Sequence, residues 1–346
     1  MHKNKMASIL KGQFKKVYII AEIGVNHNGS LELALKSIDA ASKAGANAVK
    51  FQSYKVENFV SIYAEKANYQ KQNSGSLESQ YEMLKRYEIT QREQIILKDY
   101  CEKMNIDFLA TPFDEETAVF LNKIGVHAYK IGSGDLTNIP LIRKVDDIGL
   151  PIILSTGMAS LSEIDEALDN ITNSDVALLH CTSNYPAPLE DINLRAMVNM
   201  HNTFNKIVGY SDHTLGFEVS LGAVALGAKI IEKHFTLDKN FDGPDHKASL
   251  NPDEFKLFVN SIRNIEKSLG DGKKRCMPSE LSTRDVARKS LVINKNIDSG
   301  EIITKNNLSI KRPGYGIAPK FFDLMIGRTV KRNMKQDQIL TWDDVL

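Results

Sequence analysis

Two histidines at the ends of apolar segments are the side chains of this sequence best suited to bind a divalent metal. His213 ends the segment IVGYSDH (207–213), and His234 lies near the end of the next one, KIIEKHFT (229–236). Two imidazoles with nearby carboxylates and open coordination positions suit a cation that acts as a Lewis acid. The alternative is that each is a hydrogen-bonded core histidine. Two such residues on consecutive segments favour the metal site.

Other apolar segments also end in polar side chains. Lys50 and Lys130 would be costly to bury without an anionic partner. With the small turns KIGSGD and STGM, whose backbone N–H groups are accessible, they predict a site for phosphate or carboxylate. Glu22 and Asp245 are candidates for a general base or an orienting group, or for salt bridges to these lysines. The polar residues at segment ends are Glu22, Lys50, Thr111, Lys130, Ser133, Ser155, Thr156, Ser183, Ser211, His213 and His234.

Eight apolar segments of strand length alternate with helical patterns. Their nearly continuous apolar character is typical of parallel strands that are covered on both faces. Eight such alternations predict a (β/α)8 barrel, with a doubly wound open sheet as the alternative. Active sites of barrels lie at the C-terminal ends of the strands, so the polar ends should meet in one pocket. The predicted strands are 17–24, 48–52, 107–113, 128–134, 151–157, 176–183, 207–213 and 229–236.

Composition narrows the class of protein. The chain has 346 residues and a formal net charge of +1, so no overall field attracts nucleic acid. Three widely spaced cysteines indicate a reducing compartment and no disulfide framework. The basic N-terminus lacks the apolar core of a secretory signal, and no stretch approaches the length of a membrane span. We expect a cytoplasmic enzyme without a membrane anchor. The GxGxxG spacing of dinucleotide sites is absent, which argues against a nicotinamide cofactor.

A second, smaller domain follows the barrel. We place the barrel at residues 1–270, a polar linker at 271–285 and a β-rich module at 286–346. The last segment contains short strands, SG and PGYG turns and no long helical pattern.

Nine stretches together resemble the sialic acid synthase family, which includes N-acetylneuraminate, legionaminic acid and pseudaminic acid synthases. They cover residues 17 to 345 in the family's order, and a set of this size is far more specific than any single motif. The C-terminal module resembles the family's antifreeze-like domain, also called the SAF or β-clip domain. The stretches are AEIGVNHNGS, KFQSYK, TPFD, YKIGSGD, ILSTGMAS, YPAP, GYSDHT, EKHFTLDK and GPDHKASL.

The resemblance implies a specific reaction. Family members condense phosphoenolpyruvate with the open-chain aldehyde of an N-acetylated amino sugar and water, releasing phosphate. It implies that His213 and His234 hold Mn²⁺ or Mg²⁺, and that Glu22 positions water or moves a proton. It also implies a homodimer in which the antifreeze-like domain covers the partner's barrel. Residues implied to bind phosphoenolpyruvate are Lys50, Thr111, Lys130, Ser133, Ser183 and Ser211, and those implied to contact the sugar are Gln52, Asn73, Tyr185, Asp245 and Arg312.

Several alternatives remain open from the sequence. N-acetylmannosamine is the preferred sugar, and a 2,4-diacetamido-6-deoxy hexose that gives legionaminic acid, or less readily pseudaminic acid, is the alternative. Ser183 and Asn184 are both candidates for the contact with phosphoenolpyruvate, because some members read CTNIYP where this chain reads CTSNYP. Outside the family, a Schiff-base aldolase could use Lys50 or Lys130 as a nucleophile. A non-catalytic carbohydrate-binding protein is the third possibility.

Overall fold

The structure, a computed structural model, describes residues 5–67, 70–71 and 78–346. The chain divides into two compact units, Met1–Gly270 and Asp271–Leu346. The first unit contains eight parallel strands in the order β3-β2-β1-β8-β7-β6-β5-β4. Strands β3 and β4 at the ends of this order pack side by side, which closes the sheet and confirms the predicted (β/α)8 barrel. The strands are β1 (Tyr18–Gly24), β2 (Ala48–Ser53), β3 (Asp107–Pro112), β4 (Tyr129–Ile131), β5 (Ile152–Ser155), β6 (Val176–Cys181), β7 (Ile207–Asp212) and β8 (Ile230–His234).

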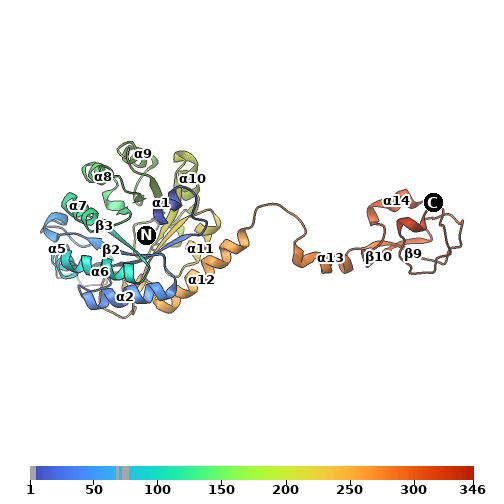
Figure 1. The fold of residues 1–346 in the computed structure, drawn as a ribbon, viewed down its shortest axis with the longest axis horizontal. Coiled ribbons are helices and arrows are strands. Elements are labelled where there is room, and N and C mark those ends of the chain that lie inside the picture. Colours follow the sequence, from blue (N-terminus) through green and yellow to red (C-terminus); the bar gives the residue numbers. More distant parts are fainter. Residues whose placement is uncertain (1–4, 68–69, 72–77) are drawn as a thin grey trace. The chain divides into compact units, whose positions relative to one another are not determined.

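A ring of helices surrounds the strands (Figure 1). Their apolar faces pack on the outward side chains of the strands to form the main core. The helices of this unit are α1 (Lys5–Leu10), α2 (Leu31–Ala44), α3 (Val56–Phe59), α5 (Gln80–Tyr87), α6 (Gln91–Lys103), α7 (Glu115–Lys123), α8 (Ile139–Asp146), α9 (Leu161–Asp169), α10 (Leu194–Phe204), α11 (Glu218–Ala225) and α12 (Pro252–Leu269).

Local sequence signals set the helix ends. Helix α9 begins after a capping box, in which Ser160 accepts from the backbone N–H of Glu163 and the glutamate side chain accepts from the Ser160 backbone. Helix α12 has Pro252 in its first turn and ends at Gly270. Helix α2 ends at Gly45, whose positive φ of 93° suits glycine.

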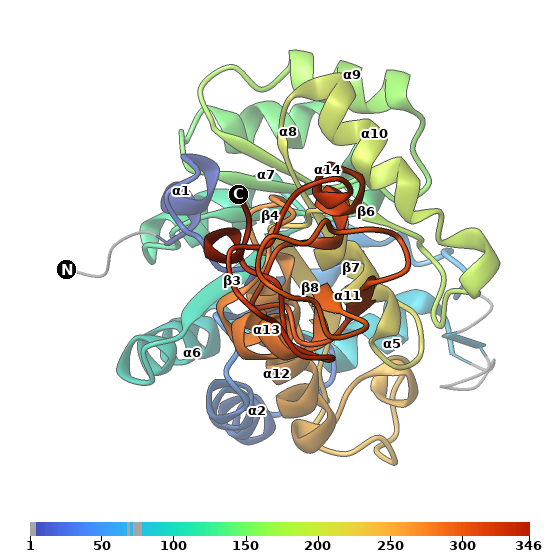
Figure 2. The ribbon, with the colours of Figure 1, turned by 90° about the vertical axis from the view of Figure 1, so that its right-hand side faces the viewer.

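The barrel interior has two levels. Strand side chains alternate in direction, so residues two apart point inward together. The lower level is apolar and includes Ile20, Ile153 and Ile230, and Met6 and Ile9 of helix α1 pack beneath it. In the perpendicular view of Figure 2, α1 and α5 lie on opposite sides of the barrel. Because Met6 and Ile9 pack beneath the lower level, helix α1 covers the N-terminal end of the barrel. The C-terminal end carries the long loops.

The second unit has its own apolar core. Its antiparallel strands are β9 (Ser290–Ile293) and β10 (Leu308–Lys311), and it also contains helix α14 (Phe322–Met325). Helix α13 (Leu281–Ala287) lies where the sequence predicted only a polar linker. This helix is seven residues long, too short for an apolar periodicity to be recognised. Among the described residues, no helix combines the length and the hydropathy that a lipid bilayer would require.

Candidate active site

The second level of the barrel interior is a polar cavity of about 240 Å³ at the C-terminal ends of the strands. It contains the next inward residue of each strand: Glu22 follows Ile20, Lys130 follows Ala128, and Glu232 follows Ile230. The strand alternation that builds the apolar level therefore also builds the site. Its lining residues are Glu22, Lys50, Gln52, Thr111, Phe113, Lys130, Gly132, Ser133, Gly134, Ser155, Met158, Cys181, Ser183, Tyr185, Ser211, His213, Glu232, His234 and Asp245.

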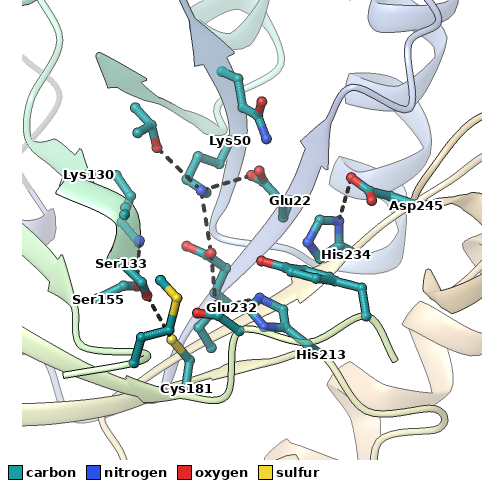
Figure 3. A pocket seen from close by; sticks show the side chains of 18 of the residues that line it. Glu22, Lys50, Lys130, Ser133, Ser155, Cys181, His213, Glu232, His234 and Asp245 are labelled. Carbon is teal, nitrogen blue, oxygen red and sulfur yellow. Dashed lines mark hydrogen bonds and ion pairs between the residues drawn. The ribbon is translucent and has the colours of Figure 1, made fainter. Parts of the chain in front are cut away.

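Lys50 lies between two carboxylates. Its Nζ is 3.3 Å from Glu22 Oε2 and 3.4 Å from Glu232 Oε1, and it donates a 3.4 Å hydrogen bond to Thr111 (Figure 3). Burial alone would lower the pKa of Lys50, but Glu22 and Glu232 outweigh it and the pKa is raised. Lys50 is therefore an ammonium group at neutral pH and is held at a fixed place.

The two glutamates titrate differently although both contact Lys50. Burial raises the pKa of Glu22 to about 8, with Lys50 opposing the shift. Burial also acts against ionisation of Glu232, but Lys130 and Lys50 together lower its pKa to about 2. Two carboxylates this close favour one shared proton, and Glu232 has the second lysine beside it. At neutral pH Glu22 is thus the protonated member and Glu232 the ionised one.

Lys130 lies on the opposite side of the cavity and is only 2 % exposed. It donates to Ser155 Oγ at 2.6 Å and to the Ile131 carbonyl at 3.1 Å. Burial lowers its pKa, and the field of Glu232 opposes that shift. Neither hydrogen-bond acceptor is charged, so within hydrogen-bond reach Lys130 has no anionic partner, and Glu232 acts on it only through its field.

Three hydroxyl or thiol groups gather next to Lys130. Ser133 Oγ is 3.0 Å from Cys181 Sγ and accepts a 3.0 Å hydrogen bond from the Gly157 N–H. A Cβ placed on Gly157 would come within 2.3 Å of Ser183 Oγ. Only glycine therefore leaves this space open. Ser183 lines the cavity, whereas Asn184 accepts from the Tyr185 N–H and lines a neighbouring depression.

The two predicted metal ligands lie together in the cavity. The ring centroids of His213 and His234 are 5.6 Å apart. His213 Nδ1 is 2.7 Å from the Thr182 carbonyl, which can only accept, so Nδ1 carries the proton and Nε2 is left as a donor for a metal. Burial lowers the pKa of His213 to about 4 and that of His234 well below its usual value. Both rings are therefore neutral at physiological pH, as metal binding requires.

The donor set fits a cation with open positions. His234 Nδ1 is buried without a hydrogen-bond partner, and Asp245 Oδ2 lies 3.9 Å from it. Among the described residues no three His, Cys, Asp or Glu side chains form a complete metal cluster. Two imidazoles would thus leave several coordination positions for substrate and water, as in catalytic rather than structural sites.

Asp245 and Tyr185 form the wall above the histidines. The Tyr185 ring lies 4.1 Å from the His213 ring and 5.6 Å from that of His234, centroid to centroid. Burial raises the pKa of Asp245 to about 7. Ser249 Oγ donates to the Asp245 carbonyl at 2.7 Å and thereby anchors its loop.

The structure brings together twelve of the fourteen residues predicted from the sequence. Asn73 lies outside the described residues. Arg312 belongs to the second unit, so its contact with a sugar stays a prediction. The twelve are Glu22, Lys50, Gln52, Thr111, Lys130, Ser133, Ser183, Tyr185, Ser211, His213, His234 and Asp245.

Sequence reasoning missed Glu232 and Cys181, and also Phe113 and Met158 at the rim. Glu232 lies two residues before His234 in β8, so strand alternation would have placed both side chains inside the barrel. Cys181 follows Leu179 in β6 in the same way. The alternation signal was present in the sequence, but at β8 only His234 was predicted, and the neighbouring Glu232 was not.

Comparisons with known proteins identify the family of this chain. The NeuB family matches residues 37–274, and the SAF domain matches residues 288–346. The chain is 47 % identical to N,N'-diacetyllegionaminic acid synthase of Campylobacter jejuni, with 94 % of this chain and 99 % of that one covered. It is 42 % identical to the synthase of the same name from Legionella pneumophila, with 97 % and 96 % covered.

A crystal structure of N-acetylneuraminic acid synthetase from Leptospira borgpetersenii, in complex with citrate, has a similar fold. The TM-score is 0.69 at 40 % identity, and the match covers 78 % of this chain and 90 % of that one. The family model matches most of the barrel, the relatives are similar over nearly their whole length, and the fold is shared. The chain belongs to the NeuB family of sialic-acid-type synthases.

Proposed function

We propose that this enzyme condenses phosphoenolpyruvate with the open-chain aldehyde of an N-acetylated amino sugar, adds water and releases phosphate, giving a nonulosonic acid. The observation that carries the proposal is one cavity in which two buried lysines and two neutral histidines face the same space. Lysines suit the three negative charges of phosphoenolpyruvate, and the histidines suit a cation that activates the second substrate.

Lys50 and Lys130 would hold phosphoenolpyruvate from two sides. The hydroxyls of Ser133 and Ser183 would donate to its phosphate in the space that Gly157 leaves open. The lysines are buried and hydrogen-bonded, and Ser133 accepts from the Gly157 N–H, so these three groups are fixed before substrate arrives. Fixed donors and two substrates held face to face remove much of the entropic cost of a bimolecular reaction.

His213 Nε2 and His234 would bind Mn²⁺ or Mg²⁺. The cation would stabilise negative charge on the aldehyde oxygen while carbon 3 of phosphoenolpyruvate forms the new C–C bond. Tyr185 and Asp245, which flank the histidines, would contact the sugar. Asn73 and Gln52 are further proposed sugar contacts.

Glu22 and Glu232 would divide the proton chemistry. Water adds to carbon 2 after the C–C bond forms, and the resulting tetrahedral intermediate loses phosphate through cleavage of the C–O bond. Glu232, ionised at neutral pH, can orient the incoming water or accept its proton. Glu22, protonated at neutral pH, can donate a proton to an oxygen that gains negative charge.

We further propose that the sugar is the uncharged 2,4-diacetamido-2,4,6-trideoxymannose and the product N,N'-diacetyllegionaminic acid. Relatives of that name are 47 % and 42 % identical to this chain. Among the described barrel residues, the cavity is lined by no cation other than Lys50 and Lys130, and both lie where phosphoenolpyruvate would bind. The barrel residues would therefore offer the phosphate of a phosphorylated sugar no side-chain cation of its own. N-acetylmannosamine and the diacetamido sugar that gives pseudaminic acid are also uncharged, and they are the comparison substrates in the test.

Arg312 in the second unit would reach the sugar of a partner subunit in a homodimer. This arrangement is tested by mixing two inactive proteins, one carrying His234→Ala and one carrying Arg312→Ala. Recovered activity in the mixture supports a site shared between subunits. Two variants that stay inactive together, while each is folded and dimeric, contradict it.

Phosphate release tests the whole proposal. Full-length protein is incubated with phosphoenolpyruvate, Mn²⁺ and each candidate sugar, and phosphate and product mass are measured. We expect release only when both metal and sugar are present, with the diacetamido sugar preferred and EDTA abolishing the reaction. Borohydride trapping with pyruvate tests the aldolase alternative, for which the lowered pKa of Lys130 is the favouring observation. A trapped lysine adduct, or release that survives EDTA, would reject the proposed mechanism.

A further inference from the structure

We propose that a buried ion pair outside the cavity, Asp212–Lys233, is the positioning device that fixes the separation of His213 and His234 for metal binding. The inference rests on the proposed function in one respect, that these histidines bind a cation. Each member of the pair directly precedes one of the two histidines in the sequence. Neither lines the cavity.

The pair lies at the last point where the two strands are joined. The register of β7 and β8 runs Tyr210 with Ile231, Ser211 with Glu232, and finally Asp212 with Lys233. The histidines are the next residue of each strand. Their backbones are therefore placed by the final rung of the ladder and by whatever holds that rung together.

Beyond that rung, the histidines are attached to different neighbours. The His213 carbonyl accepts from the Ala187 N–H at 2.9 Å, which ties it to the loop after β6. The His234 carbonyl accepts from the Leu250 N–H at 2.9 Å, and His234 pairs in register with Glu22 of β1. The two imidazoles would drift apart if these two sides of the barrel shifted relative to each other.

Side chains of the pair join the two sides. Lys233 Nζ is 3.2 Å from Asp212 Oδ1 and donates to the Thr214 carbonyl at 2.5 Å. Asp212 and Thr214 flank His213, so one ammonium group on β8 contacts the side chain of the residue before that histidine and the backbone of the residue after it. On the cavity side, Ser211 donates to Glu232 at 3.1 Å. The ladder end is thus fastened on both faces of the sheet.

Both carboxylate oxygens of Asp212 accept hydrogen bonds. Oδ1 also accepts from the Thr214 N–H at 2.9 Å and from Thr214 Oγ1 at 2.7 Å, while Oδ2 accepts from Ser220 Oγ of α11 at 2.6 Å. Asp212 and its three partners, Thr214, Ser220 and Lys233, are each at most 1 % exposed. A buried carboxylate with both oxygens engaged has little freedom to move, and it transfers that rigidity to the adjacent histidine.

An ordinary stabilising role is the competing explanation, since breaking any buried ion pair destabilises a protein. The chain offers a matched control. Asp146 is 3 % exposed and accepts from the backbone N–H groups of Thr172 and Asn173 at 2.8 and 3.0 Å. These residues precede β6, so Asp146 fastens a loop at the opposite end of the barrel.

The test measures Mn²⁺ affinity of the full-length protein without substrates, by the electron paramagnetic resonance signal of free Mn²⁺. The variants are Asp212→Asn, Lys233→Met and the double variant, which leaves no unpaired buried charge and guards against failure to fold. We expect the Mn²⁺ dissociation constant to rise about 10- to 100-fold in each. Asp146→Asn should lower the unfolding temperature but leave the Mn²⁺ dissociation constant unchanged. Saturating Mn²⁺ should restore the KM for phosphoenolpyruvate to the wild-type value.

The result that overturns the inference is wild-type Mn²⁺ affinity in folded variants whose unfolding temperature falls as in Asp146→Asn. The pair would then act on stability alone, and the proposed metal site would stand. A wild-type protein that binds neither Mn²⁺ nor Mg²⁺ would instead overturn the metal site, and the inference with it.

Discussion

The two ends of the barrel interior are built by the same strands with opposite chemistry. At the N-terminal end Ile20, Ile153 and Ile230 pack on helix α1, and each is fully buried. At the C-terminal end, two residues further along these strands, stand Glu22, Ser155 and Glu232, which line the cavity.

The difference also appears in how polar atoms are partnered. At the lower end Tyr18 donates to Asp107 at 2.7 Å, and Lys5 pairs with the same carboxylate at 3.0 Å. At the upper end Glu232 Oε2 and His234 Nδ1 are buried without hydrogen bonds, and Glu22 Oε2 has only its ion pair with Lys50. Buried atoms without partners cost free energy, so they point to groups that bind something else. The N-terminal end of the interior thus contributes to folding stability, whereas the C-terminal end keeps buried polar atoms available to bind substrates at some loss of stability. Four predictions test this division.

The largest effect is expected from Lys130→Met. Removing this cation should lower kcat/KM for phosphoenolpyruvate by about 10²–10³-fold, because a fixed charge facing the reacting anion is lost. Phosphate release measures the change, and thermal unfolding reports the fold. Lys55→Met, which removes a half-exposed lysine paired with Glu116, is the control and should keep wild-type activity. Wild-type activity in the Lys130 variant would contradict the assignment of the C-terminal end to substrate binding.

Ile153→Ala should show the reverse pattern. Truncating a fully buried side chain of the lower level should cost about 2–5 kcal/mol of unfolding free energy, because a cavity remains. We expect kcat/KM to stay near wild type at a temperature where the variant is folded. Urea unfolding and phosphate release measure the two quantities. A large loss of activity with unchanged stability would contradict the assignment of this level.

Glu22→Gln should change how stability depends on pH. The pKa of Glu22 is about 8 in the folded protein against 4.5 ordinarily, so between these values the unfolded chain binds fewer protons. Wild-type stability should therefore fall with rising pH relative to the variant, by up to about 1.4 kcal/mol per pH unit.

The unfolding temperatures of both proteins, measured without metal from pH 5 to 9, give this difference directly. Contributions of the histidines cancel because both proteins share them. The gap should widen up to pH 8 and then level off. A constant gap would mean that Glu22 is ionised throughout and cannot be the proton donor.

Lys5→Met should have the smallest effect. The ion pair with Asp107 is partly exposed, with the Lys5 side chain 26 % accessible, and such pairs contribute up to about 1 kcal/mol. Urea unfolding should show at most that loss, and phosphate release should be unchanged. An effect on activity would show that the N-terminal end communicates with the site.

Much of the fold was predictable because its signals are local. Eight apolar segments alternating with helical patterns specified the barrel, and residues such as Ser160 and Gly270 specified helix ends. Nine of the twelve predicted residues that line the cavity followed from one rule, that polar side chains at strand ends meet at one face of a barrel. Gln52 and Tyr185 were implied only by the family resemblance, and Asp245 lies in a loop after β8. Helix α13 was missed because it is short and has no buried residue.

The sequence by itself determined which side chains enter the cavity, since strand alternation is a property of the chain alone. Only the tertiary structure decided which of those side chains are protonated and which are ionised at neutral pH. Glu22 and Glu232 are the same residue type, yet one is protonated and the other ionised at neutral pH, because Lys130 comes to lie near Glu232 from a strand a hundred residues away. Likewise, no local pattern joins Asp212 to Lys233. Charges act through space, and distances in space are fixed only when the barrel closes.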